Sequence, residues 1–188
     1  MSTLPEPRRR TASREATSLS SRVPMSGPVD VLVVDTDKPR GRALAAELLG
    51  LGVTVLAAHT TSDAEEKASG ARVILLRRKL GETDAFAFAR ILRKKTDVPL
   101  RLLILADTPN AEDVLRAIDA LALGITFEPH TPDSLLRRIR KALESDPAEL
   151  TDQGDAQVFR VRRGGVVFKL RARPELLVDY MLQATEAL

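Results

Sequence analysis

Four charged residues that could take part in chemistry follow closely on short apolar runs of the chain: Asp35, Asp37, Arg77 and Glu128. An arginine stays protonated in proteins, so Arg77 cannot serve as a nucleophile or a general base. A guanidinium group forms charge-assisted hydrogen bonds where carboxylates lie beside it.

Other catalytic chemistry has little support in the residue types. The chain has no cysteine, and its two histidines, His59 and His130, stand far apart and outside any recognisable Ser-His-Asp context. The phosphate-cradling spacing GxxxxGK[ST] does not occur. We expect no enzymatic activity, no catalytic residue, no metal site and no cofactor, and we expect His130 to be structural.

The elements that must position the charged residues alternate along the chain. Short, nearly continuous apolar runs typical of strands buried on both faces occupy residues 31–34, 53–57, 73–76, 100–106 and 123–127. Helical patterns occupy residues 38–50, 62–68 (with Ser62 as a cap), 84–95, 111–122 and 132–143. This alternation predicts an α/β fold with a doubly wound, five-stranded parallel sheet.

The ends of the chain differ in composition from this central part. Residues 1–28 are rich in Ser, Arg and Pro and hold five arginines against two acids, whereas the rest of the chain is balanced in charge. We predict a disordered tail over 1–28, a domain over 29–145, a polar linker over 146–156 and an extension over 157–188. The tail is alternatively a basic arm for an acidic partner, or residues 1–24 are not translated and Met25 is the start.

A basic run begins at Arg77 and includes Arg78, Lys79 and several residues of the predicted helix 84–95. We interpret it as a solvated surface; the alternative is a site for an anionic partner.

Four stretches in order resemble the receiver domains of two-component response regulators. They are VDVLVVDTDKPRGRAL, RVILLRRKLGETDAFAFARILR, TDVPLRLLILAD and GITFEPHTPDSLLRRI, and together they span about residues 29–145. The resemblance implies the flavodoxin-like receiver fold. Receivers of this family take a phosphoryl group onto an aspartate with the help of a divalent metal, a hydroxyl side chain and a lysine.

This sequence departs from that pattern at most of the chemical positions. Asp35 matches the first acid of the metal pair, but Thr36 stands at the second, with Asp37 one residue further on. The acceptor aspartate falls on Arg77, or on Leu76 if the register is shifted by one. Neither can accept a phosphoryl group.

The hydroxyl position falls on Ala106 and the lysine position on Glu128, followed by Pro129 as in the family. In the family the acceptor aspartate and the lysine face each other as opposite charges. The resemblance therefore implies that Arg77 contacts Glu128, with the two charges exchanged, and contacts Asp35 where the metal would sit. The alternative is that these side chains point into solvent. We predict a degenerate receiver that is not phosphorylated in the family manner. A small phosphoryl-accepting switch would require Asp35 or Asp37 to be an unorthodox acceptor.

Residues 157–188 predict a β-hairpin around Gly164–Gly165 and a helix from Pro174. The segment resembles the start of a winged-helix output domain, although we expect no recognition helix to follow. Basic residues that could contact phosphates non-specifically are Arg160, Arg162, Arg163 and Lys169. The alternative is that the segment docks on the receiver or mediates dimerisation.

These observations favour a signalling module, a pseudo-receiver of a two-component or phosphorelay pathway that acts by protein–protein interaction. The resemblance implies a protein partner or self-association through the last two helices and the fifth strand, the surface that the family uses. We also expect no membrane partner and a cytoplasmic location. The alternative is a DNA-associated transcriptional regulator, because a nucleic-acid partner is possible but less favoured.

Overall fold

The computed structural model describes residues 28–146, 157–163, 166–172 and 177–178. Nearly all of the predicted tail and linker, the Gly164–Gly165 turn and most of the predicted last helix lie outside these ranges; Leu177 and Val178 are helical. Within the described ranges no helix is long and apolar enough to cross a membrane.

Five parallel strands form the central sheet in the order β2-β1-β3-β6-β7. The strands are β1 (Val29–Val34), β2 (Val55–Ala58), β3 (Ala71–Arg77), β6 (Leu102–Ala106) and β7 (Gly124–Phe127). The order changes direction beside β1, where the chain passes from β2 on one side to β3 on the other. The predicted doubly wound sheet of the flavodoxin-like kind is therefore confirmed.

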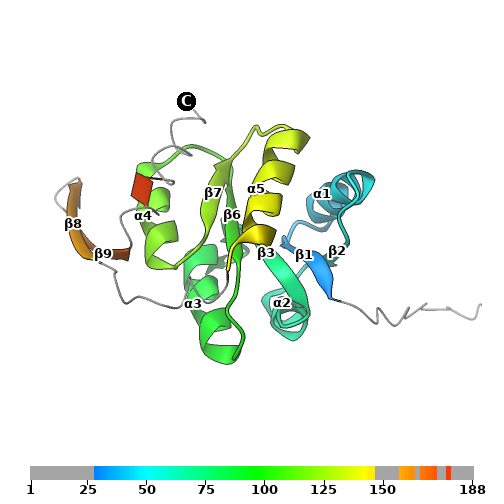
Figure 1. Ribbon diagram of the computed structural model, residues 1–188, viewed down its shortest axis with the longest axis horizontal. Coiled ribbons are helices and arrows are strands. Elements are labelled where there is room, and N and C mark those ends of the chain that lie inside the picture. Colours follow the sequence, from blue (N-terminus) through cyan, green and yellow to red (C-terminus); the bar gives the residue numbers. More distant parts are fainter. Residues whose placement is uncertain (1–27, 147–156, 164–165, 173–176, 179–188) are drawn as a thin grey trace, which may run out of the picture.

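Helices cover both faces of this sheet (Figure 1). They are α1 (Lys38–Gly50), α2 (Thr61–Ala68), α3 (Ala85–Lys95), α4 (Ala111–Asp119) and α5 (Pro132–Glu144). α1 and α5 share one apolar core with the sheet, and α2, α3 and α4 share the other.

Alternate residues of β1 serve the two cores. Val31 and Val33 lie in the core beneath α1 and α5, while Leu32 and Val34 lie in the core beneath the other helices. Because successive side chains of a strand point to opposite faces, a strand covered on both sides needs apolar residues at every position. This explains the unbroken apolar runs in the sequence.

Several predicted boundaries are wrong by a few residues. The cap of α2 is Thr60, whose hydroxyl accepts the N–H of Asp63, and not Ser62, which lies inside the helix. Val53 is not in a strand; its N–H donates to the carbonyl of Leu48 and closes the end of α1. α4 ends at Asp119, because Leu121 has a φ of 54° that does not continue a helix.

A short antiparallel pair, β4 (Lys79–Leu80) with β5 (Thr83–Asp84), replaces the loop expected between β3 and α3. Gly81 connects the two strands with a φ of 65°, a left-handed conformation that glycine adopts without steric cost. Asp84 then caps α3 by accepting the N–H groups of Phe86 and Ala87.

The predicted hairpin is present as β8 (Gln157–Arg163) and β9 (Val166–Ala172), paired antiparallel. β9 lies against α4 (Figure 1). Leu170 is buried in the same core as α2, α3 and α4, and Phe159, Val161 and Leu177 pack against that core. The hairpin therefore docks on the central domain, which was one of the two alternatives that the sequence left open.

Because the hairpin docks through Leu170, shortening this side chain should lower the stability of the protein. Leu170→Ala should lower the free energy of unfolding by about 2–3 kcal/mol, because it leaves a cavity at a position that is 1% exposed. Hydrogen exchange should also become faster in β8, β9 and α4. Val158→Ala, on the exposed side of the same hairpin, is the matched control and should change stability by less than about 0.5 kcal/mol. Equal effects of the two substitutions would contradict the docked arrangement.

Candidate functional site

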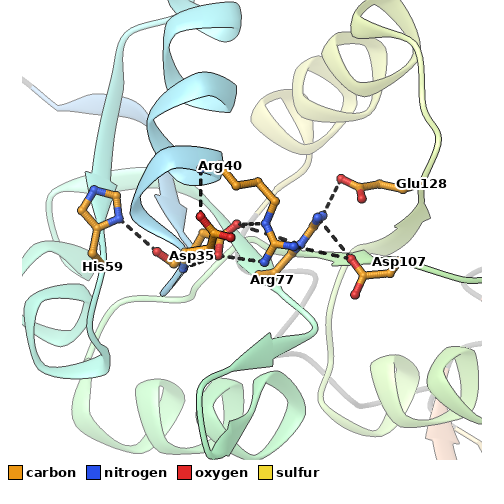
Figure 2. Close-up of polar contacts among 7 residues, drawn as sticks. Asp35, Arg40, His59, Arg77, Asp107 and Glu128 are labelled. Carbon is orange, nitrogen blue, oxygen red and sulfur yellow. Dashed lines mark hydrogen bonds and ion pairs between the residues drawn. The ribbon is translucent and has the colours of Figure 1, made fainter.

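Four neighbouring strands bring charged residues to one edge of the sheet. Arg77 is the last residue of β3, and Asp35, Asp107 and Glu128 directly follow β1, β6 and β7. The carboxyl ends of parallel strands meet at the same edge, which is where ligands bind in doubly wound folds. Figure 2 shows these side chains converging on the Arg77 guanidinium.

Arg77 is the centre of this cluster and is 3% exposed. Its Nη1 donates to Glu128 Oε1 at 2.7 Å, its Nη2 lies 3.1 Å from Asp107 Oδ1, and its Nε lies 3.9 Å from Asp35 Oδ2 (Figure 2). Nε and Nη2 form ion pairs without hydrogen-bond geometry. The predicted contacts of Arg77 with Glu128 and with Asp35 are thus both confirmed, the first as a hydrogen-bonded ion pair.

A second arginine, Arg40, holds Asp35. Its Nε donates to Oδ2 at 2.7 Å and its Nη2 to Oδ1 at 3.0 Å, a two-point contact on a carboxylate that is 3% exposed. Arg40 lies in the first turn of α1, which begins immediately after Asp35 because Asp37 caps it and Pro39 favours its first turn. The backbone N–H of Asp37 also donates to Asp35 Oδ1 at 2.9 Å.

Sequence reasoning missed Arg40 and Asp107. Asp107 directly follows Ala106, so the sequence already placed it at a strand end. The comparison with the receiver family, however, considered only Ala106, which stands at the family's hydroxyl position. The Nη1 atom of Arg40 lies 3.9 Å from Asp107 Oδ1, so the Asp35–Arg40 pair and the ion pairs of Arg77 form one network. His59 was also missed as a neighbour of the site: its Nδ1 lies 3.0 Å from the backbone oxygen of Asp35 (Figure 2).

The remaining predicted positions have local roles. Asp37 uses its carboxylate as the cap of α1, accepting the N–H of Arg40 at 3.1 Å, and Thr36 is half-buried beside it. Ala106 is buried, and its carbonyl accepts the N–H of Glu128 at 2.9 Å. The Glu128–Pro129 peptide bond is cis.

The four predicted phosphate contacts lie elsewhere, on the hairpin. Arg160 and Arg162 are exposed on β8, while the side chains of Arg163 and Lys169 lie outside the described part of the structure. None of these four belongs to the cluster around Arg77.

The neighbouring residue Arg78 forms a second network on the α4 side of the sheet. Its Nη1 lies 2.8 Å from Asp84 Oδ2 and its Nε donates to Asp113 Oδ1 at 2.8 Å, while Arg116 reaches Asp84 at 2.9 Å. Both guanidinium groups lie over the ring of Phe86, at 4.9 and 4.7 Å from its centroid. Our interpretation of the basic run as a solvated surface is therefore wrong for Arg77 and Arg78.

Electrostatics keep the cluster ionised. The hydrogen bond from Arg77 lowers the pKa of the Glu128 carboxyl against the opposing effect of burial, and the charges of Arg77, His130 and Arg40 lower it further. The hydrogen bond to Asp35 raises the pKa of the Arg40 guanidinium, again against burial. Both groups therefore carry their charges throughout the neutral pH range.

The donor set does not fit the divalent metal that the resemblance implies. A hard cation needs carboxylate oxygens, yet both oxygens of Asp35 accept hydrogen bonds from Arg40, and Arg77 adds a second permanent positive charge nearby. Among the residues described, no group of three His, Cys, Asp or Glu side chains is placed to hold a metal ion. What this arrangement can do chemically is fix four strand ends by ion pairing.

Comparison with known proteins gives likeness in structure alone, since no family model and no curated protein matches this chain. A response-regulator receiver domain from Clostridium thermocellum is 19% identical with a TM-score of 0.55, covering 61% of this chain and 94% of that one. A response-regulator signal receiver domain from Bermanella marisrubri is 24% identical with a TM-score of 0.56, covering 61% and 98%.

The N-terminal domain of a response regulator/sensory box/GGDEF three-domain protein from Carboxydothermus hydrogenoformans is 26% identical, with a TM-score of 0.53 over 61% of this chain and 93% of that one. Together with the strand order, these likenesses show that the central domain has the receiver fold.

The Arg77–Glu128 pair predicts coupling between the two side chains. Arg77→Gln should lower the free energy of unfolding by about 2–3 kcal/mol, because three carboxylates then face one another without the guanidinium. In a double-mutant cycle with Glu128→Gln, denaturant unfolding should give a coupling energy of about 1–2 kcal/mol. Arg42→Gln, at an exposed position of α1, is the control and should be neutral within about 0.5 kcal/mol.

The same cycle should depend on pH. Because folding lowers the pKa of Glu128, its contribution to stability is complete above its ordinary value of 4.5 and disappears as the pH falls through the lower folded value. The stability difference between the wild type and Glu128→Gln should therefore shrink below pH 4.5. Additive single effects at neutral pH, or a difference that grows in acid, would show that the pair does not stabilise the fold.

Proposed function

We propose that this protein is a pseudo-receiver: a signalling module of a two-component-like pathway, working in the cytoplasm, that is not phosphorylated and acts by binding another protein. The observation that carries the proposal is the buried Arg77 at the end of β3, ion-paired with Glu128, Asp107 and Asp35. In the family that the sequence resembles, the acceptor aspartate and the lysine stand at the positions of Arg77 and Glu128, so the two charges are exchanged.

The loss of acceptor chemistry follows from that exchange. The nitrogen lone pairs of a protonated guanidinium are delocalised, which makes it a poor nucleophile toward phosphorus, and its charge repels the metal that would assist the transfer. Asp35 remains, but its two oxygens are held by Arg40 and its side chain is 3% exposed. Asp37 is exposed and engaged as a helix cap.

The ion pairs also favour a module held in one conformation. Glu128 and Asp107 belong to the loops after β7 and β6, and Arg77 ties both to β3. Arg78 and Arg116 tie α3 and α4 together through Asp84 and Asp113. Segments that would have to shift in a phosphorylation switch are thereby joined by charge pairs that no phosphoryl group controls.

The partner surface that we propose is the exposed side of α5, the helix that follows the edge strand β7. The sequence favoured the last two helices with the fifth strand, and β9 with Leu170 already lies against α4. α5 presents exposed side chains that include Arg137 and Arg140. This leaves α5 as the open part of the predicted surface.

Phosphorylation is tested directly by incubating the protein with acetyl phosphate and Mg²⁺ and measuring its intact mass. We expect an unchanged mass, while a receiver domain that retains its acceptor aspartate gains one phosphoryl group under the same conditions. A gain of one phosphoryl group that disappears in Asp35→Asn or Asp37→Asn would overturn the pseudo-receiver proposal and identify the acceptor.

The partner surface is tested with a photo-crosslinking amino acid placed in the cell at Arg137 on α5 or at Arg42 on α1. We expect a discrete protein adduct, or a crosslinked dimer, from position 137 and none from position 42, since both are exposed but only one lies on the proposed face. Adducts of equal yield from both positions, or none from position 137, would contradict the assignment.

A further inference from the structure

The hairpin formed by β8 and β9 concentrates positive charge, whereas the rest of the chain beyond residue 28 has five more acidic than basic residues. Residues 157–163 and 166–172 include five basic residues and no Asp or Glu, whereas the chain beyond residue 28 has equal numbers of acids and bases. The positive charge of this surface is therefore local, and it belongs to one small element of structure.

The register of the hairpin separates its apolar side from its basic side. Residues directly opposite each other in an antiparallel pair lie on the same face, and faces alternate along each strand. Phe159 is opposite Leu170, and this face packs onto the core beneath α4. Arg160 is opposite Lys169, and Arg162 is opposite Val167, on the other face.

The face away from α4 is exposed. Val158 and Val167 are 65% and 47% exposed, and Arg160 and Arg162 are exposed as well. Within the described residues neither Arg160 nor Arg162 contacts an acidic side chain, in contrast to Arg77, which is surrounded by carboxylates.

We propose that this face, here called the basic ribbon and described at Val158, Arg160, Arg162 and Val167, binds duplex DNA through its phosphates. Cations without acidic neighbours gain most from a polyanion, which releases condensed counterions when it binds. The major groove admits a two-stranded β-ribbon, so the shape of the element fits as well as its charge. A symmetric dimer through two such ribbons is disfavoured, because the two basic faces repel each other.

Docking on α4 gives the ribbon its orientation. The hairpin lies beside α4 (Figure 1). Its apolar face packs on the core of the receiver-fold domain, so the opposite face of the ribbon is directed away from that core. The inference goes beyond the pseudo-receiver proposal and does not depend on it, since DNA binding by the hairpin requires nothing of Arg77.

The test is fluorescence anisotropy of a short labelled DNA duplex, titrated with the full-length protein at several salt concentrations. We expect a dissociation constant in the non-specific range of about 10⁻⁴–10⁻⁶ M that weakens steeply with salt. In Arg160→Gln with Arg162→Gln, the slope of log affinity against log salt should fall by about two, because two phosphate contacts are lost. Arg160→Lys with Arg162→Lys should restore most of the affinity.

The matched control is Lys38→Gln with Arg42→Gln, which removes the same charge from exposed positions on α1, at the end of the molecule away from the hairpin (Figure 1). This variant should bind like the wild type. Equal loss in both double variants would mean that overall charge alone drives binding, and would overturn the proposal. So would a lack of DNA binding by the wild type, or a hairpin-dependent preference for polyglutamate over DNA. Circular dichroism of each variant confirms that the fold is intact.

Discussion

The guanidinium of Arg77 is buried where four strand ends meet, and a buried charge is tolerated only when opposite charges and hydrogen bonds surround it. Glu128, Asp107 and Asp35 supply those charges from three different loops. Asp35 in turn would add a buried negative charge without Arg40, which contacts both of its oxygens. Each loop at this edge of the sheet is therefore positioned by its contribution to one electrostatic cluster.

Arg78, the residue after the end of β3, forms ion pairs on the opposite side of the sheet. Consecutive residues of an extended chain point in opposite directions, so Arg78 faces α3 and α4 while Arg77 faces α1 and α5. Arg78 reaches Asp113 on α4 and Asp84 at the cap of α3, and the ring of Phe86 lies beneath it. Two adjacent arginines thus connect β3 to elements of both layers, and the second network fixes the helix on which the hairpin rests.

The hairpin of β8 and β9 packs on the same side of the sheet as the Arg78 network. Leu170 takes part in the core that contains Phe86 and Ile118, so the extension is packed on the domain that the Arg78 network stabilises. An amphipathic two-stranded ribbon is marginally stable alone and requires a surface to cover its apolar face. The α4 side of the sheet provides that surface, and the opposite face of the ribbon, with Arg160 and Arg162, stays exposed.

The sequence by itself determined the order of the elements, since short apolar runs such as 31–34 and 73–76, alternating with helical patterns, are typical of a parallel sheet covered on both faces. It also determined that two residues of opposite charge, Arg77 and Glu128, would stand at strand ends, because each directly follows an apolar run.

The tertiary structure decided which other residues completed the cluster around Arg77. Arg40 and Asp107 contact Arg77 or Asp35 because a helix turn and a neighbouring strand end fold back onto the same edge, and no local pattern encodes that approach. It likewise decided that the hairpin docks on α4: the alternation of residues in β8 shows that one face is apolar, but the surface covering that face comes from residues far away along the chain.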